Sequence, residues 1–295
     1  MKDFFKKKYI WAIFYTILLI SFTIYVILDT FVITKVYATI SNNNQDPTSQ
    51  NVTITDNSYS DENINIQLTE FQEYDTTIYV ADIKLSSPKY LKTAFAQNAY
   101  GQNVNQKTSE IAKNNNGILA INGDYYGVRK KGYVIRNNII YRDSYVYNKE
   151  DLVIYSDGSF EMIKEQNITA TELLENNAMH VLSFGPALIT NSEISIKKTE
   201  EVKKSQKSNP RTAIGIIDKN HYIFVVSDGR TKESKGLSLY QLAEFMKTLN
   251  VTTAYNLDGG GSSTMYFNGK IINNPTTSGN TIKERKVSDI VYIGY

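Results

Sequence analysis

An apolar run without a charged residue, Tyr9 to Leu28, constrains this chain most. About twenty residues at ~1.5 Å each would span the ~30 Å hydrocarbon core of a bilayer as a helix. Lys6, Lys7 and Lys8 precede the run, and positively charged flanks stay on the cytoplasmic side. We therefore predict a cytoplasmic tail at 1–8, a single-pass transmembrane anchor at 9–28, and a remainder outside the cytoplasm.

A cleaved signal peptide is the alternative interpretation, because Val36-Tyr37-Ala38 has some likeness to a small-residue cleavage site. The length of the apolar run favours an uncleaved anchor. Residues 29–63 are rich in Ser, Asn, Thr, Gln and Asp and show little periodicity, which predicts a flexible extracytoplasmic tether. The globular domain is expected at 64–295.

Composition excludes several kinds of site. The chain has no cysteine, which rules out disulfides, thiolate metal ligands and a cysteine nucleophile. His180 and His221 are its only histidines, so a histidine-rich metal site is excluded and a Ser-His-Asp triad is disfavoured. Lys plus Arg is 32 against 30 for Asp plus Glu, a balance that gives no reason to expect a nucleic-acid partner.

The fold prediction rests on hairpin turns and helix caps. Alternating segments predict strands, and Asn-Asn, Asp-Gly and Asn-Gly pairs predict hairpins between them. Thr169 with Glu172, and Ser238 with Gln241, form capping boxes that begin helices. We predict an α+β fold: a mixed, largely antiparallel sheet core built from hairpins, with two or three packed helices. The helix from Ser238 is expected to act as a βαβ crossover.

Two stretches follow predicted strands and carry candidate chemistry. Asp258 ends one strand and is followed by Gly259–Gly261, where three glycines suggest positive φ or a close backbone approach. Exposed N–H groups on such a loop suit an anion. Asn122-Gly123-Asp124 ends another strand, and its residues fit a hairpin turn and a sugar-binding carboxylate equally well. The lysine-rich stretch 197–209 is interpreted as a solvated loop.

Five motifs occur in one order along the chain, and together they resemble the phosphodiester glycosidase family over about 81–295. They are Asn122-Gly123-Asp124-Tyr125-Tyr126, Gly185-Pro186-Ala187-Leu188, Asn209-Pro210-Arg211-Thr212-Ala213-Ile214-Gly215, Asp228-Gly229-Arg230 and Leu257-Asp258-Gly259-Gly260-Gly261-Ser262-Ser263. The resemblance implies hydrolysis of a sugar-1-phosphodiester at the bond between the anomeric carbon and phosphate. An extracytoplasmic enzyme would meet such links in cell-envelope glycans or exopolysaccharides.

The resemblance also implies roles for individual residues. Asp258 is the first catalytic candidate, followed by Asp124 and Asp228, because an oxocarbenium-like sugar needs a carboxylate. Which of them is nucleophile or base stays open. The substrate-binding candidates supply cations, amides and hydroxyls, and are Asn122, Arg211, Arg230, Asn256, Gly259, Gly260, Gly261, Ser262 and Arg285.

Two questions about function stay open at this point. Ca²⁺ and Mg²⁺ are the candidate metal cofactors, since Asp and Asn oxygens suit them, but the sequence defines no ligand set. A non-catalytic glycan-binding or assembly protein of exopolysaccharide biosynthesis is the alternative function, and a phosphodiesterase that cuts the P–O bond is a third.

Overall fold

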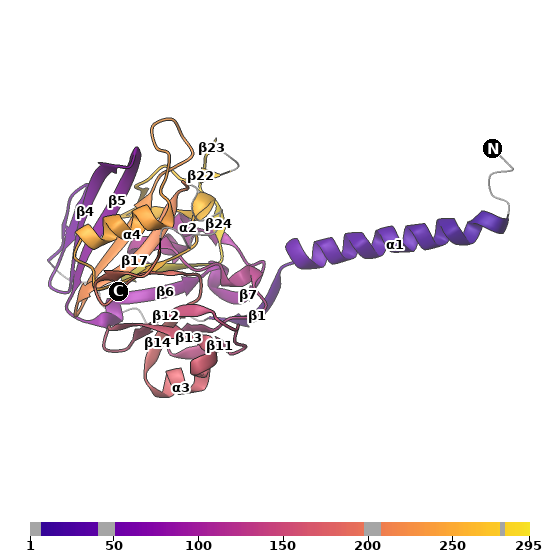
Figure 1. Cartoon of the computed structure of the whole chain (residues 1–295), viewed down its shortest axis with the longest axis horizontal. Helices are drawn as coiled ribbons and strands as arrows, with labels where there is room; N and C mark the ends of the chain where they lie inside the picture. Colours follow the sequence, from indigo (N-terminus) through magenta and orange to yellow (C-terminus); the bar gives the residue numbers. More distant parts are fainter. Residues whose placement is uncertain (1–6, 41–50, 198–207, 278–280) are drawn as a thin grey trace.

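The computed structural model describes residues 7–40, 51–197, 208–277 and 281–295. Helix α1 (Lys7–Phe31) projects from a body built of three main sheets (Figure 1). It contains one span, Tyr9–Phe31, long and apolar enough to cross a membrane, and none of that span is buried in the protein. Most of the lysine-rich stretch 197–209 lies outside the described residues.

The largest sheet has nine strands and carries most of the candidate site. In spatial order it consists of β16 (Glu193–Ile194), β15 (Ala187–Thr190), β19 (Thr253–Asn256), β17 (Arg211–Asp218), β18 (His221–Ser227), β5 (Thr76–Leu85), β4 (Ile64–Glu73), β3 (Ser58–Ser60) and β2 (Thr53–Ile54). Strand β17 pairs with β18 on one side and β19 on the other, both antiparallel.

Two five-stranded sheets complete the body. The β9 sheet contains β21 (Lys270–Ile271), β20 (Met265–Phe267), β9 (Gly117–Asn122), β25 (Asp289–Gly294) and β6 (Leu91–Phe95). The β10 sheet contains β11 (Ile139–Arg142), β10 (Val134–Arg136), β14 (Ala178–Leu182), β12 (Glu150–Tyr155) and β13 (Phe160–Lys164). Three strand pairs stand apart: β1 (Lys35–Thr39) with β7 (Ala99–Gln102), β22 (Thr276–Thr277) with β23 (Thr281–Ile282), and β24 (Lys286–Val287) with β8 (Gln106–Lys107).

The three main sheets share one core, and each has a helix on its other face. Alternation along β5 shows why: Tyr79, Ala81 and Ile83 point into the shared core, whereas Ile78 and Val80 pack in the cluster beneath α4 (Leu239–Thr248). Helix α2 (Thr108–Asn114) packs on the β9 sheet and α3 (Ala170–Glu175) on the β10 sheet. Short 3₁₀ turns connect the strands: η1 (Pro88–Tyr90), η2 (Ala96–Asn98), η3 (Tyr126–Val128), η4 (Glu165–Asn167) and η5 (Gly260–Ser262).

This architecture confirms the predicted α+β fold with a largely antiparallel core and packed helices. Every strand pairing within the described residues is antiparallel. Both capping boxes are present, with Thr169 and Ser238 as the N-cap residues. The Asn137-Asn138 and Asn268-Gly269 turns do connect hairpins.

One expectation is confirmed and one needs correction. Helix α4 connects β18 to β19 as the predicted crossover: both strands run antiparallel to β17, which lies between them, so they are parallel to each other. The predicted tether at 29–63 includes structured elements, since β1 pairs with β7, and β2 and β3 extend the largest sheet. Polar composition concealed these short strands, because β1 and β3 are fixed by pairing with β7 and β4, which lie outside the segment.

Candidate active site

Strand ends from two sheets bring the predicted motifs to one place. At one end of the largest sheet, Arg211 pairs with Ser227 and Ala213 pairs with Asn256. The residues that follow β18 and β19 therefore emerge beside the start of β17. Strand β9 ends at the same place, because the Asp258 N–H donates to the Gly123 carbonyl at 3.3 Å. The motifs that follow one another along the sequence are thus close together in the fold.

Asn122 is the fully buried centre of this junction. Its Nδ2 donates to the main-chain carbonyl of Asp258 at 2.6 Å. Its Oδ1 accepts from the Thr212 hydroxyl at 2.8 Å and from the Thr264 N–H at 3.3 Å. Asn122 therefore positions the Asp258 turn instead of facing a ligand, and Asn122-Gly123 is not a hairpin turn.

Asp258 presents a carboxylate at the edge of the junction, with 13% of its side chain exposed. Its Oδ2 accepts from the Ser262 hydroxyl at 2.5 Å and from Arg285 Nη2 at 2.8 Å. Burial raises the pKa of Asp258, while the hydrogen bond from Ser262 and the charge of Arg285 oppose that rise. The carboxyl group therefore combines partial burial with a cationic partner, as in many catalytic sites.

Each glycine of the turn after Asp258 lies against an arginine. A Cβ on Gly259 would lie 3.8 Å from Arg211 Cδ, and one on Gly260 would lie 2.7 Å from Arg230 Nη2. A Cβ on Gly261 would lie 3.5 Å from Arg285 Cδ. Gly260 also has φ +63°, the left-handed region that favours glycine. Three arginines therefore adjoin one turn, and at Gly260 the absence of a side chain is what allows Arg230 to approach.

The cations, more than the amides, make this turn suitable for an anion. The Gly260 N–H donates to the Pro210 carbonyl at 2.8 Å, so it is not available as the sequence led us to expect. Arg230 is exposed and donates to Asn209 Oδ1 at 3.1 Å, while Arg211 is nearly buried and its Nε donates to the Leu237 carbonyl. Arg285 has 41% of its side chain exposed.

Asp228 is held as a structural anchor. Its Oδ1 accepts from the Asn274 N–H at 2.8 Å and from Asn273 Nδ2 at 3.2 Å. Its Oδ2 accepts from Asn274 Nδ2 at 3.0 Å and from the Tyr79 hydroxyl at 3.4 Å. Four donors leave this buried carboxylate little capacity for a substrate, so the arrangement favours a role in fixing the loop at 273–274.

Asn256 connects the junction to the Gly185-Pro186 bend. Its Nδ2 donates to the Gly185 carbonyl at 2.8 Å, and its N–H donates to the Pro186 carbonyl at 3.2 Å. The Asn256 Oδ1 is buried and accepts no hydrogen bond. Such an acceptor is costly unless a ligand or water completes it, which keeps Asn256 among the binding candidates.

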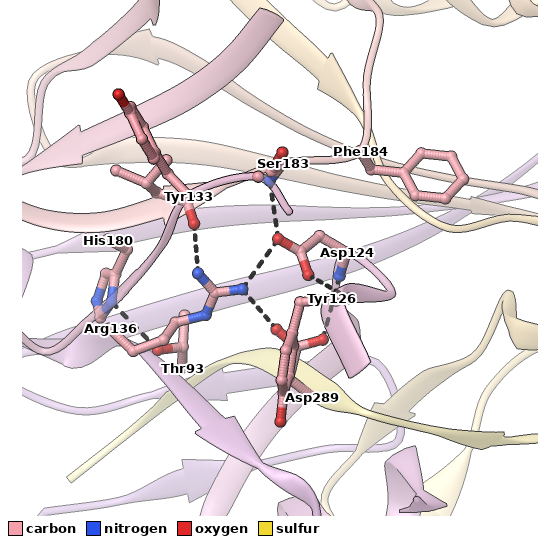
Figure 2. Close-up of polar contacts among 12 residues, drawn as sticks. Thr93, Asp124, Tyr126, Tyr133, Arg136, His180, Ser183, Phe184 and Asp289 are labelled. Atoms are coloured by element: carbon pink, nitrogen blue, oxygen red, sulfur yellow. Dashed lines mark hydrogen bonds and ion pairs between the residues drawn. The ribbon is translucent and has the colours of Figure 1, made fainter. Parts of the chain in front are cut away.

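Asp124 belongs to a buried ion cluster that sequence reasoning missed (Figure 2). Arg136 Nη2 donates to Asp124 Oδ2 at 3.0 Å and to Asp289 Oδ2 at 2.8 Å, and all three side chains are at most 1% exposed. The Ser183 N–H also donates to Asp124 Oδ2, at 2.8 Å. With no exposed surface, Asp124 supports the turn from beneath.

The two carboxyl groups of this cluster are not equivalent. Burial opposes ionisation of Asp124, but Arg136 and the Ser183 N–H outweigh it and lower its pKa below the usual value. Burial and the charge of Asp124 raise the pKa of Asp289 to about 7. Gly123 allows this packing, because a Cβ there would lie 2.2 Å from Asp289 Oδ1. The strand pattern around Asp289 gave no signal of a partner.

A second group of ionisable residues lies beneath the Ser183–Phe184 segment. Lys149 Nζ donates to the Phe184 carbonyl, and Arg129 Nη1 donates to the Ser183 carbonyl. Burial and Arg129 lower the pKa of Lys149, and burial with Glu165 raises the pKa of Asp151 well above its ordinary value. None of these residues stood out in the sequence, since each lies in an ordinary polar stretch.

The described residues contain no group of three or more His, Cys, Asp or Glu side chains that could hold a metal ion. The candidate site thus consists of one partly exposed carboxylate, three arginines around a glycine turn, and neutral amides that position them. Such a set favours chemistry on an anionic ester, with the charge carried by guanidinium groups.

Comparison with protein families assigns this arrangement to a class of hydrolases. The model of the phosphodiester glycosidase family matches residues 115–294, which include every strand end described above. The chain belongs to the phosphodiester glycosidase family.

Curated relatives match only part of their own length. The SPbeta prophage-derived uncharacterized protein YomE of Bacillus subtilis is 27% identical over 203 residues, 66% of this chain and 31% of that protein. The human N-acetylglucosamine-1-phosphodiester alpha-N-acetylglucosaminidase is 32% identical over 126 residues, 39% of this chain and 24% of the human protein. The chain therefore spans about a quarter to a third of these relatives.

Solved structures share the fold. The catalytic domain of zebrafish N-acetylglucosamine-1-phosphodiester alpha-N-acetylglucosaminidase superposes with a TM-score of 0.63 at 21% identity. The match covers 89% of this chain and 88% of that one. A hypothetical protein from Synechocystis superposes with a TM-score of 0.55 at 15% identity, covering 79% of this chain and 62% of that one.

Proposed function

We propose that this protein is a membrane-anchored, extracytoplasmic hydrolase that cleaves a sugar-1-phosphodiester between the anomeric carbon and the phosphate oxygen. Its substrate would be a cell-envelope glycan or exopolysaccharide. One observation carries the proposal: a partly exposed carboxylate, Asp258, adjoins a glycine turn flanked by Arg211, Arg230 and Arg285. Family membership supports the reaction class.

The geometry supports separate roles for the glycine turn with its arginines and for Asp258. The phosphodiester would lie on the glycine turn, where Arg230 and Arg285 are exposed enough to bind its oxygens. The anomeric carbon would then face Asp258, whose ionised form stabilises positive charge developing on the sugar. Phosphate leaves as an anion without a strong acid, so a second catalytic carboxylate is not required. This fits the buried, paired states of Asp124 and Asp228.

The proposal does not choose between two roles for Asp258: nucleophile, or electrostatic stabiliser of the charge on the sugar. Ser262 and Arg285 hold one oxygen of the carboxylate, Oδ2, and fix its direction. A neutral isostere would keep the shape of the site and remove the charge. Asp258→Asn should therefore lower kcat by at least ~10²-fold at unchanged thermal stability, a loss typical for removal of one catalytic group.

The test is a screen of sugar-1-phosphodiesters against the full chain in detergent, with Asp258→Asn as the matched variant. Release of free sugar by the wild type and not by the variant supports the proposal. Full activity in Asp258→Asn would exclude Asp258 from catalysis. Saturable binding of an anionic glycan without any product would instead favour the non-catalytic binding or assembly function.

Anchoring by α1 has its own test. The N-terminal residue of the mature protein should be that of the uncleaved chain, and the protein should remain in the membrane after washing with high salt. A mature N-terminus near Thr39 would identify the apolar helix as a cleaved signal peptide and remove the anchor from the proposal.

A further inference from the structure

The connection between α1 and the globular domain is short and held by hydrogen bonds. Three residues separate the end of α1 from the start of β1, which pairs with β7. Asn103 reaches from the domain to the helix end, where its Nδ2 donates to the carbonyls of Thr30 and Ile33, both at 3.1 Å. Lys35 and Asp29 form an ion pair at 2.7 Å across the same junction. The domain is therefore held close to the end of the apolar helix.

The turn η3 lies directly beside this junction. The Asn103 N–H donates to the Gly127 carbonyl at 3.1 Å, so one residue binds both α1 and η3. Gly127 packs tightly, because a Cβ there would lie 2.4 Å from Ser288 Oγ. In Figure 1, α1 leaves the body of the protein at β1 and β7. The surface around η3 consequently lies next to the end of α1, where a helix that crossed a bilayer would leave it.

The side chains on this surface are those found at membrane interfaces. Tyr125 and Val128 are each 39% exposed, and on β1 Val36 is 51% and Tyr37 is 61% exposed. The two groups are adjacent, because the ring of Tyr100 on β7 lies 5.9 Å from Tyr37 and stacks on Tyr126 of η3 at 5.3 Å. Exposed apolar side chains gathered in this way mark an interaction surface. Tyrosine favours the boundary between headgroups and water, where its ring and hydroxyl meet different solvents. Lys130 and Lys131 follow η3 and are also exposed.

We propose that the membrane-facing surface, defined as Val36, Tyr37, Tyr125, Val128, Lys130 and Lys131, rests on the headgroups of an anionic bilayer. This inference depends on the proposed anchor, because it takes α1 to cross that bilayer. Lysines near an anionic membrane surface are attracted to it. Such a contact gives the domain a second attachment to the membrane, beside the junction with α1.

The same loop connects this surface to the candidate active site. Tyr125 directly follows Asp124, and Arg129 Nη1 donates to the Ser183 carbonyl, whose own N–H donates to Asp124. The Asp258 N–H donates to the carbonyl of Gly123, which precedes Asp124. Contact with the bilayer therefore places the site at a fixed, short height above the membrane, within reach of glycans attached near its surface.

The absence of cysteine allows a direct test with single-cysteine variants of the full chain. Val128→Cys carries an environment-sensitive nitrobenzoxadiazole label in vesicles of phosphatidylcholine and phosphatidylglycerol that contain headgroup-proximal spin-labelled lipid. Tyr74→Cys is the matched control, because Tyr74 is 38% exposed and lies between β4 and β5. These two strands are on the side of the body away from α1 (Figure 1). The label at Val128→Cys should be quenched and the label at Tyr74→Cys should not.

Equal quenching of the two labels in a chain that floats with the vesicles would overturn the inference and leave the anchor intact. A chain that fails to float with the vesicles would contradict the anchor itself, and the inference with it. Replacing Lys130 and Lys131 by glutamine should weaken quenching at Val128→Cys in these anionic vesicles. Unchanged quenching in that variant would overturn the assigned role of the two lysines.

Discussion

The side-chain amide of Asn122 donates a 2.6 Å hydrogen bond to the main-chain carbonyl of Asp258, joining two motifs that lie 136 residues apart in the chain. One strand end from the β9 sheet thereby fixes the turn that follows β19 in the largest sheet. The position of the candidate catalytic carboxylate thus depends on a neutral amide that has no exposed surface.

Thr212→Val should destabilise the protein, because the Thr212 hydroxyl donates to Asn122 Oδ1 at 2.8 Å. Loss of that donor should cost ~1 kcal/mol or more, since the acceptor is buried. Thr264→Val is the matched control: its hydroxyl is buried without a hydrogen-bond partner, so the same change should be neutral or stabilising. Denaturant unfolding measures both, and equal losses would contradict the role given to Asn122.

Gly260→Ala should reduce activity as well as stability. A Cβ there would lie 2.7 Å from Arg230 Nη2, so Arg230 must move away from the turn. Gly269→Ala separates this effect from backbone strain, because Gly269 also has positive φ, at +88°, but no atom within 4 Å of the added Cβ. Each variant should lose ~1–2 kcal/mol from strain. Only Gly260→Ala should raise KM, and equal kinetics would contradict the assigned phosphate position.

Much of this site could be predicted from local pattern, and the rest could not. The glycines follow β19, Arg230 follows β18 and Arg211 begins β17, all strands that the sequence indicates clearly, so their proximity follows from strand pairing. Arg136 and Asp289 lie 153 residues apart and meet only because β9, β10 and β25 converge. No periodic pattern in the sequence indicates that contact. For the same reason Asp124 resembles a sugar-binding residue in the sequence and is a buried ion-pair partner in the fold.

Arg285→Gln should shift the acidic limb of the kcat/KM profile to higher pH. Burial raises the pKa of Asp258, and Arg285 holds it down through a 2.8 Å contact. Removing that cation lets the pKa rise further, so ionised Asp258 is reached only at higher pH. The profile should be compared with that of the wild type at constant ionic strength. An unmoved limb would show that the rate does not depend on ionisation of Asp258.

Asp289→Asn should flatten the pH dependence of stability. The folded pKa of Asp289 is about 7, above the ~3.9 of an unfolded aspartate, so the folded state binds more protons between these values. Stability contributed by this group is therefore complete below pH ~4 and is lost as pH rises toward 7. Asn removes the titration and keeps the shape. Thermal unfolding should show a smaller fall in Tm from pH 5 to 8 in the variant; parallel curves would contradict the assignment.

Hydrolysis in ¹⁸O-labelled water tests the central claim most directly. The account places the sugar carbon against Asp258 and the phosphate on the arginine-flanked turn, so water should enter at the anomeric carbon. Mass spectrometry of the products should find the label in the released sugar and not in the phosphate. Label in the phosphate would mean that the P–O bond is cut, and would contradict the proposal that this protein acts as a glycosidase.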